Sequence, residues 1–331
     1  MNLPAAPIPP TIADVSLAAA RIAGLAVRTP LLSSAALDQR VGGRVLLKCE
    51  TLQRTGSFKF RGACNAIAAI DPDVREAGVL AVSSGNHAQG VAEAARLFGC
   101  AATIVMPADA PANKRAGTLR SGAVIVDYDR ATEDRDALAA KVLAERGGTL
   151  VHPYNDPLVI AGQGTIGLEI LADAEKLGAV PDAVLIPCGG GGLSSGVGLA
   201  MKSGAPDITI GLVEPEGFDD YGRSLHEGRP VRNARTSGSI CDALLAPSPG
   251  AMGFALNRGN GAVAMAVSDA EALAAVAFAF RELKLVVEPG GAVGLAAILS
   301  GKFDCRGKTV AVVLSGGNID PPVLQQALAT A

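Results

Sequence analysis

A lysine stands between two phenylalanines in the segment TGSFKFRGA, residues 55–63. Burying its ammonium group there without a partner would cost free energy, and burial lowers the pKa of a lysine. Lys59 therefore either extends its charge to solvent or carries a neutral amine that can act as a nucleophile or a base. The second alternative requires further groups around the amine, and three turns of the sequence offer them.

The first turn is PCGGGGLSSG, in which an apolar run leads into four glycines, Gly189 to Gly192. Glycines let the backbone approach a ligand closely, and N–H groups at the start of a following helix attract an anion such as phosphate. The segment is no P-loop, and Ser194 and Ser195 stand where a dinucleotide-binding G-x-G-x-x-G would need glycine. A flexible strand-to-helix turn is the alternative, but the entropic cost of four glycines favours a ligand.

Two other apolar runs also end in small polar residues. The first leads into a predicted helix through side chains and N–H groups that suit a carboxylate, those of Ser83, Ser84, Gly85, Asn86 and His87. A plain helix N-cap would explain only one of these polar residues. Ser315 ends the run KTVAVVLS, where its hydroxyl could meet a ligand, although a serine of an ordinary turn is the alternative.

Taken together, these features suit a phosphorylated aldehyde cofactor. Its aldehyde would condense with a neutral lysine amine, its phosphate would need backbone donors, and its ring nitrogen would need one hydrogen-bond partner. The combination is more specific than any one of the turns.

The elements that would position these groups follow from the alternation of Val- and Ile-rich runs with Ala-rich stretches. The pattern predicts strands at 44–50, 78–84, 101–107, 123–128, 182–188, 208–215 and 308–315, and helices at 57–70, 87–99 and 133–148. Such alternation predicts a parallel sheet with helices on both faces. Ligands of these sheets bind beyond the carboxyl ends of the strands, which is where the three turns lie.

Composition limits the class of protein. The chain has 331 residues, enough for two domains, with 49% hydrophobic and 18% charged residues, as in a globular protein. A net charge of −3 and an aromatic content of 3% argue against nucleic-acid and membrane partners. Six scattered cysteines and a proline-rich start without the features of a secretory leader predict a reduced, cytoplasmic protein.

The motifs resemble those of fold type II (β-family) pyridoxal-5′-phosphate enzymes, and most closely the group of threonine/serine dehydratases and serine racemases, which includes 3-hydroxyaspartate dehydratases. The resemblance covers nearly the whole chain, through KCETLQRTGSFKFRGA, SSGNHAQGVA, HPYNDPLVIAGQGTIGLEI, PCGGGGL, VEPEGFDDY, KLVVEPGGAVGLAA and VVLSGGN in family order. It implies a tryptophan synthase β-like α/β fold of two open, twisted, mostly parallel sheets flanked by helices. The active site would lie in the cleft between a large domain, residues 1–70 and 158–331, and a small domain, residues 71–157, with no C-terminal regulatory domain.

The resemblance also implies roles for single residues. Lys59 would hold pyridoxal 5′-phosphate covalently, Phe58 would pack near its ring, Asn86 would bind its ring oxygen, and Ser315 would face its ring nitrogen. The phosphate would be bound by Gly189, Gly190, Gly191, Gly192 and Leu193, and the substrate carboxylate by Ser83, Ser84, Gly85, Asn86 and His87. Lys59 and Ser84 would be the catalytic pair, because in racemases of the group the position of Ser84 faces the substrate opposite the lysine.

The acidic segment EPEGFDDY suggests a metal. Its carboxylates, those of Glu214, Glu216, Asp219 and Asp220, are the oxygen ligands that hard divalent cations favour, although a solvated acidic turn is the alternative. In metal-bearing members of the group the matching ligands are Glu214, the carbonyl of Phe218, and Asp220. The resemblance therefore implies a Mg²⁺, Mn²⁺ or Ca²⁺ ion there.

The implied activity is that of an ammonia-lyase (dehydratase) that converts a β-hydroxy-L-amino acid of the threonine and serine class to a 2-oxo acid and ammonia by α,β-elimination. Three alternatives stay open, namely 3-hydroxyaspartate dehydratase, serine racemase and a specialised catabolic dehydratase of another hydroxylated amino acid. They stay open because residues 241–246 and 288–292, which border the substrate side chain in this family, depart from its usual pattern.

Two further expectations concern partners. Hydroxyaspartate would need a cation for its second carboxylate, for which Arg135 is a candidate, although a surface arginine is the alternative. A non-catalytic amino-acid-binding relative is the hypothesis from a different class, and the intact lysine and both ligand-binding turns argue against it. The family also implies a homodimer with a small-molecule amino-acid substrate.

Overall fold

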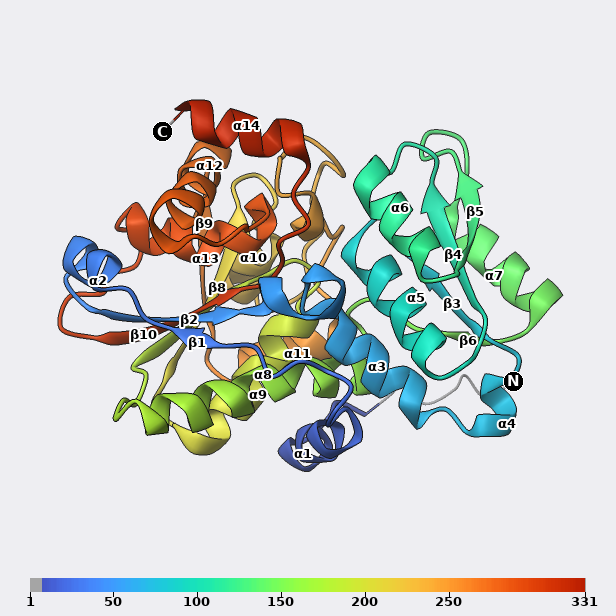
Figure 1. Ribbon diagram of the computed structural model, residues 1–331, viewed down its shortest axis with the longest axis horizontal. Coiled ribbons are helices and arrows are strands. Elements are labelled where there is room, and N and C mark those ends of the chain that lie inside the picture. The colour runs from blue at the N-terminus through green and yellow to red at the C-terminus, as the bar shows by residue number, and fades with distance from the viewer. Residues whose placement is uncertain (1–7, 331) are drawn as a thin grey trace.

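The computed structural model describes residues 8–330, so the first part of the proline-rich start and the last residue lie outside it. Its strands form two sheets (Figure 1). The six-stranded sheet has the order β1 (Leu31–Leu32), β2 (Arg44–Cys49), β10 (Thr309–Leu314), β7 (Ala183–Pro187), β8 (Thr209–Pro215), β9 (Val263–Val267). The four-stranded sheet has the order β5 (Val124–Tyr128), β4 (Ala102–Pro107), β3 (Val79–Val82), β6 (Thr149–Leu150). All neighbouring strands are parallel except β1, which pairs antiparallel with β2.

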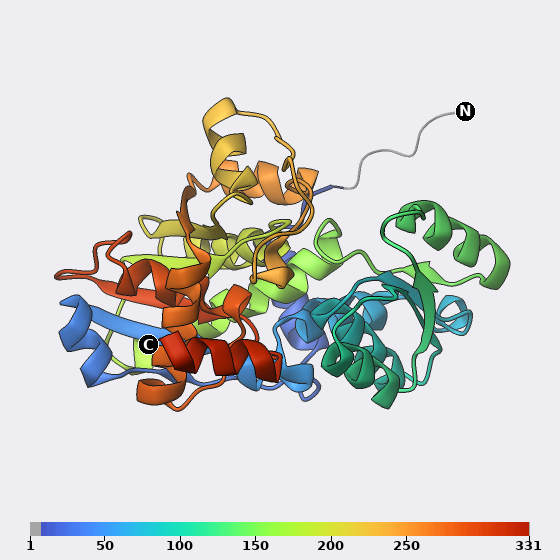
Figure 2. The ribbon, with the colours of Figure 1, turned by 90° about the horizontal axis from the view of Figure 1, so that it is seen from above.

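The helices cover both sheets. The α-helices are α1 (Ile12–Arg21), α2 (Ala35–Val41), α3 (Lys59–Ala69), α4 (Pro72–Arg75), α5 (Asn86–Leu97), α6 (Ala112–Arg120), α7 (Arg135–Arg146), α8 (Pro157–Lys176), α9 (Gly192–Gly204), α10 (Asp220–Glu227), α11 (Ala251–Gly259), α12 (Asp269–Phe278), α13 (Pro289–Leu299) and α14 (Pro321–Thr330). The short helical segments are η1 (Glu50–Leu52), η2 (Arg54–Gly56), η3 (Asp242–Leu244) and the π-helical η4 (Ala279–Leu283). Figures 1 and 2 show the six-stranded sheet on the left and the four-stranded sheet, with α5, α6 and α7, on the right.

The predicted α/β fold of two mostly parallel sheets is confirmed, and every predicted strand and helix is present with small shifts at its ends. The pattern missed β1 and β6, which have two residues each and too few positions to show a period. It also missed β9, whose small alternating side chains VAMAV are only partly buried. The division into domains at residues 70 and 158 stays a prediction, although β3 to β6, all within residues 71–157, form a sheet of their own.

The strands of the six-stranded sheet are mostly apolar because both faces are covered. Along β10, Val310, Val312 and Leu314 join one hydrophobic cluster with α12 and α13. Ala311 and Val313, which point the other way, join a second cluster with α8 and α9. The sheet therefore fixes the positions of its strand ends from both sides.

A buried network of charges holds α3 in place. Arg61 donates to both oxygens of Glu50, each over 2.8 Å, and to Glu169 over 2.8 and 2.9 Å. Lys48 of β2 donates to Glu169 over 2.6 Å. The two cations and two carboxylates balance, which is the condition under which buried charges are tolerated. Arg61 lies on the first turn of α3, so the network anchors the helix that begins at Lys59.

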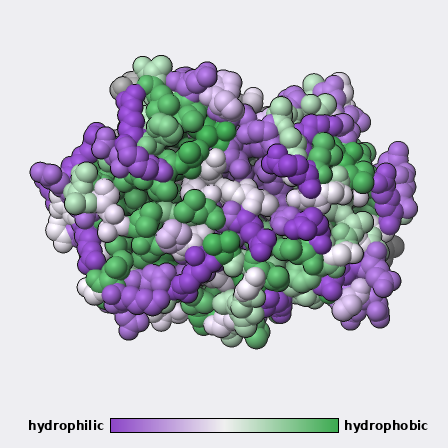
Figure 3. Space-filling view, in the orientation of Figure 1, coloured by the Kyte–Doolittle hydropathy of each residue, from purple (hydrophilic) through white to green (hydrophobic). Residues whose placement is uncertain are grey.

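The outer surface carries mixed polarity. In the view of Figure 3, hydrophobic side chains gather in several patches that hydrophilic ones separate. Among residues 8–330, no helix combines the length and the apolar character that crossing a membrane requires.

We expect Arg61→Met to lower the free energy of unfolding by about 3–5 kcal/mol, because it leaves Glu50 buried without its guanidinium. Equilibrium urea unfolding measures the loss. Arg28→Met is the matched control, since Arg28 is half exposed in its pair with Asp173, and it should cost less than about 1 kcal/mol. Equal losses in the two variants would contradict the role of the network.

Candidate active site

A cavity of about 190 Å³ contains Lys59 together with the three turns predicted from the sequence. The turns follow β3, β7 and β10, so they meet at the carboxyl ends of strands from both sheets. Every predicted cofactor and substrate residue lines this cavity, namely Phe58, Lys59, Ser83, Ser84, Gly85, Asn86, His87, Gly189, Gly190, Gly191, Gly192, Leu193 and Ser315. The structure thus brings the set together, and the role of each residue stays a prediction.

Lys59 begins α3, and its amine has only weak partners. Its Nζ donates to the carbonyl oxygen of Pro153 over 2.7 Å and lies 5.2 Å from the centre of the Phe58 ring. Burial lowers the pKa of Lys59 from its usual 10.5 to about 8. A substantial fraction of the amine is therefore neutral near pH 8, as a nucleophile or base requires.

The segment that carries Lys59 is tied to the end of β10. The N–H of Phe58 donates to the carbonyl of Ser315 over 3.1 Å, and Ser57 forms an isolated bridge with Gly316. The lysine and the Ser315 hydroxyl are thereby held at a fixed separation, although they lie far apart in the sequence.

The segment 83–87 forms the start of α5. The N–H of Gly85 donates to Oγ of Ser83 over 3.1 Å, and the helix begins at Asn86. The first N–H groups of a helix have no acceptor within it and attract anions. Burial, with the positive charge of Lys59, lowers the pKa of His87 to about 3. His87 is therefore neutral, and its Nε2–H donates to the carbonyl of Val151 over 2.8 Å.

The tetraglycine segment has a packing role that sequence analysis missed. Gly191 has a φ of +89°, and a Cβ on it would stand 1.7 Å from the hydroxyl oxygen of Tyr221. A Cβ on Gly190 would stand 2.3 Å from the ring of Tyr154. Two tyrosines thus pack closely against the loop, and one of them, Tyr154, lines the same cavity. The glycines leave room for both rings, and the N–H groups at the start of α9 suit an anion.

Further charged residues at the cavity gave no recognisable signal in the sequence. Lys114 of α6 donates to Asp242 over 2.5 Å and lies 3.7 Å from Glu288, and Glu288 accepts from Asn86 over 2.5 Å. The sequence predicts a place beside the substrate for segments 241–246 and 288–292, which contain Asp242 and Glu288. It gives no such signal for Lys114, because the sequence around it is that of an ordinary surface helix.

Arg135, for which a surface position was the alternative, lines the cavity. It begins α7, and 47% of its side chain is exposed. Its guanidinium lies 3.6 Å from Asp136 on the same helix, a pair that is exposed and therefore weak. Arg135 is thus available to a ligand that carries a second negative charge.

The acidic segment separates into two inward and two outward carboxylates. Glu214 and Asp220 are fully buried, whereas Glu216 pairs with Lys302 and Asp219 lies near Arg223. Both oxygens of Glu214 accept backbone N–H groups of α10, and Oδ2 of Asp220 is buried without a partner. Residues 8–330 contain no cluster of three or more His, Cys, Asp or Glu side chains that could hold a metal. The metal predicted from this segment therefore stays a prediction, and Phe218, two residues before Asp220, is buried as well.

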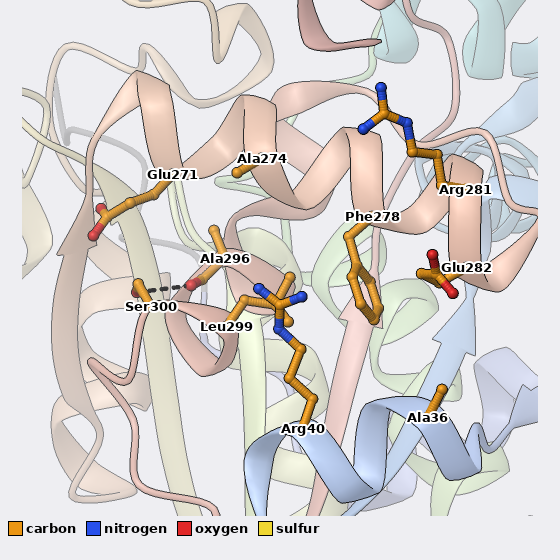
Figure 4. Close-up of a pocket in the computed structure, with 10 residues that line it drawn as sticks. All are labelled: Ala36, Arg40, Glu271, Ala274, Phe278, Arg281, Glu282, Ala296, Leu299 and Ser300. Atoms are coloured by element: carbon orange, nitrogen blue, oxygen red, sulfur yellow. Dashed lines mark hydrogen bonds between the residues drawn. The ribbon is translucent and has the colours of Figure 1, made fainter. Parts of the chain in front are cut away.

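A second cavity, of about 620 Å³, lies between α2, α12 and α13 (Figure 4). Arg40 extends from α2 toward Phe278, with its guanidinium carbon 5.3 Å from the ring centre. None of the turn residues or Lys59 lines it. It therefore lies apart from the predicted chemistry despite its size.

Known proteins match the chain over most of its length. The sequence pattern of a family described as "Pyridoxal-phosphate dependent enzyme" matches residues 22–316. An L-threo-3-hydroxyaspartate ammonia-lyase of Pseudomonas sp is 46% identical over 93% of this chain and 95% of its own length. An L-threonine ammonia-lyase of Thermotoga maritima is 42% identical over 94% and 76%. The structure of maize serine racemase is 37% identical, covers 97% of this chain and 98% of its own, and superimposes with a TM-score of 0.90.

The lowered pKa of Lys59 predicts how stability depends on pH in the protein without bound ligand. Below pH 8 the folded state pays for a buried ammonium, and this penalty fades as pH rises toward 10.5, because the unfolded state binds the extra proton in that window. Lys59→Met should therefore unfold at a higher urea concentration than the parent at pH 7, and the difference in free energy of unfolding should shrink by about 2 kcal/mol at pH 10. The lowering of the Lys59 pKa from 10.5 to about 8 would by itself be worth ~3 kcal/mol, but solvent screening at the cavity reduces that value. An advantage that does not change with pH would contradict the assignment.

Proposed function

The chain belongs to the pyridoxal-phosphate dependent enzyme family, and on this premise we propose that it is an ammonia-lyase for a β-hydroxy-L-amino acid. The reaction removes the β-hydroxyl as water and, after water is taken up again, releases the amino group as ammonia and leaves a 2-oxo acid. The observation that carries the proposal is that Lys59, with an amine of lowered pKa, shares one cavity with an anion-binding glycine segment and the open N-terminus of α5.

Pyridoxal 5′-phosphate fits this cavity. The N–H groups of residues 189–193 suit its phosphate, and Asn86 and Ser315 suit its two polar ring atoms. When bound, it supplies an electron sink for the electron pair left on the α-carbon.

The residues of the chain then have separate tasks. Lys59 would hold the cofactor through Nζ, and its free amine would accept the α-proton of the substrate at the same atom. The N–H groups at the start of α5 bind the α-carboxylate, which orients the Cα–H bond toward Lys59. Ser84, whose hydroxyl lines the same cavity, offers a second proton-carrying atom. A serine racemase would use that hydroxyl to return a proton, which is why racemisation is the alternative on the same site.

Within the substrate class, Arg135 favours 3-hydroxyaspartate over threonine or serine. It is a cation at the cavity wall, and within residues 8–330 its ion-pair partner is the exposed Asp136 at 3.6 Å. Threonine and serine have no group that would use it, whereas the second carboxylate of hydroxyaspartate would pair with it. The name of the Pseudomonas relative supports the same substrate.

A divalent cation on Glu214, the Phe218 carbonyl and Asp220 is part of the proposal. The support is that both carboxylates are buried and that Oδ2 of Asp220 has no hydrogen-bond partner among residues 8–330. A homodimer and a cytoplasmic location stay predictions from the sequence; the six free cysteines suit the latter.

A product screen tests the proposal. L-Threonine should yield 2-oxobutyrate, L-serine pyruvate, and L-threo-3-hydroxyaspartate oxaloacetate, with the last as the preferred substrate and with lower rates after EDTA treatment. Lys59→Ala should lose at least ~10³-fold in kcat, because it removes both the attachment point and the base. Turnover that persists in Lys59→Ala, or the absence of all three products, would refute an ammonia-lyase.

Arg135→Leu tests the substrate preference. We expect kcat/KM for 3-hydroxyaspartate to fall about 10- to 100-fold, as the loss of a charged hydrogen bond predicts, while the value for threonine stays within about threefold. Arg130→Leu is the matched control, since Arg130 is equally exposed but pairs with Asp109 outside the cavity. Equal losses for both substrates would show that Arg135 does not select the second carboxylate.

A further inference from the structure

The side chain of Glu288 has an unusual position for a carboxylate. Glu288 precedes α13, is 2% exposed, and lines the reaction cavity, and its side chain does not cap its own helix. Its backbone is fixed on both sides, by a bond from its N–H to the carbonyl of Gly316 and by bonds from Gly291 and Ala292 to its own carbonyl. Because this buried carboxylate does not cap α13, its position calls for a role elsewhere in the cavity.

Glu288 reaches Asn86 through a space that only glycine leaves free. Its Oε1 accepts from Nδ2 of Asn86 over 2.5 Å. A Cβ on Gly316 would stand 2.3 Å from this same oxygen and 3.3 Å from Nδ2 of Asn86. Any side chain at position 316 would therefore push the carboxylate away from the amide.

The partners of Asn86 leave its amide one orientation. Its Oδ1 accepts from Nδ2 of Asn318 over 2.8 Å, and the same Nδ2 donates to the carbonyl of Thr55 over 2.7 Å. The carbonyl of Thr55 only accepts, so the NH₂ group of Asn318 must face it and also donates to Oδ1 of Asn86. An ionised Glu288 also only accepts, so the NH₂ group of Asn86 must face Glu288. The second hydrogen on Nδ2 of Asn86 stays available for a ligand in the cavity.

Lys114 supplies the positive charge that this arrangement needs. Its Nζ lies 3.7 Å from Oε2 of Glu288, an oxygen with no hydrogen bond, and donates to Asp242 over 2.5 Å. Burial raises the pKa of Glu288, and the Lys114 ammonium counteracts that rise. Lys114 belongs to α6, beside the four-stranded sheet, whereas Glu288 lies in the part of the chain that forms the six-stranded sheet.

We propose that Glu288 is a positioning residue. Lys114, from across the cavity, keeps Glu288 ionised, and Glu288 holds the Asn86 amide so that one Nδ2 hydrogen of Asn86 is directed at the ring oxygen of the cofactor. The inference rests on the proposed cofactor role of Asn86 and adds two residues to it. Lys114 thereby links the packing of α6 against the cavity to the electronic state of the cofactor ring.

The test measures cofactor binding and its spectrum, neither of which requires turnover. Glu288→Gln keeps the size of the side chain but removes its charge and the acceptor-only constraint. We expect pyridoxal 5′-phosphate to bind this variant about tenfold more weakly and its visible absorbance band to shift. Lys114→Met should act in the same direction, and the effects of the two substitutions on affinity should fall short of additive in the double variant.

Glu271→Gln is the control, because it removes the charge from another Glu–Lys pair, with Lys302 at 2.8 Å, outside the reaction cavity. It should leave affinity and spectrum unchanged. The inference is overturned if Glu288→Gln binds cofactor within twofold of the parent with an unshifted band while Asn86→Ala does not, or if the Glu288 and Lys114 effects are fully additive. A parent protein with a cofactor band but no lyase products would refute the proposed reaction and leave this inference standing.

Discussion

The structure depends on how it treats four cations, of which Lys48, Arg61 and Lys114 are buried and Lys59 is partly buried at the cavity. Lys48, Arg61 and Lys114 each lie within 2.5–2.8 Å of a carboxylate, so their charges are balanced. Lys59 is treated differently, because its nearest polar partner is the carbonyl of Pro153. A carboxylate beside Lys59 would hold its proton and raise its pKa, whereas a carbonyl compensates only part of the burial cost. Burial lowers the pKa of Lys59 to about 8, and the carbonyl of Pro153 does not reverse that shift as a carboxylate would.

The surrounding fold makes this unbalanced position tolerable. Arg61 anchors the first turn of α3 on Glu50 and Glu169, so the helix stays in place even though its first residue is costly to bury. The bond from Phe58 to Ser315 ties the other side of Lys59 to β10, whose faces are packed on both sides. The cost of burying the lysine is thus offset by the Arg61 network, which does not line the cavity, and by the tie between Phe58 and Ser315 at the cavity wall.

The sequence was sufficient for the parts of the site that depend on local pattern. The glycine segment and residues 83–87 stand where a strand leads into a helix, and Lys59 begins a helix. Backbone donors and small side chains at such places are readable from the chain itself. The contacts of Lys114 with Asp242 and of Asn86 with Glu288 join residues 128 and 202 positions apart, and no local pattern encodes them. The packing of Tyr154 against Gly190 and of Tyr221 against Gly191 also joins distant residues, so no local pattern predicts it.

The balance of charge around the cavity explains why Arg135 matters for substrate choice. Besides Lys59, two basic side chains line the cavity, those of Lys114 and Arg135. Lys114 is already neutralised by Asp242 and Glu288, so a second carboxylate entering near it would meet two like charges. Arg135 has only Asp136, at 3.6 Å and 81% exposed, where water screens the pair. An incoming carboxylate therefore gains most at Arg135, and the carboxylates around Lys114 repel it from the other position. Selectivity of this kind comes as much from the unfavourable position as from the favourable one.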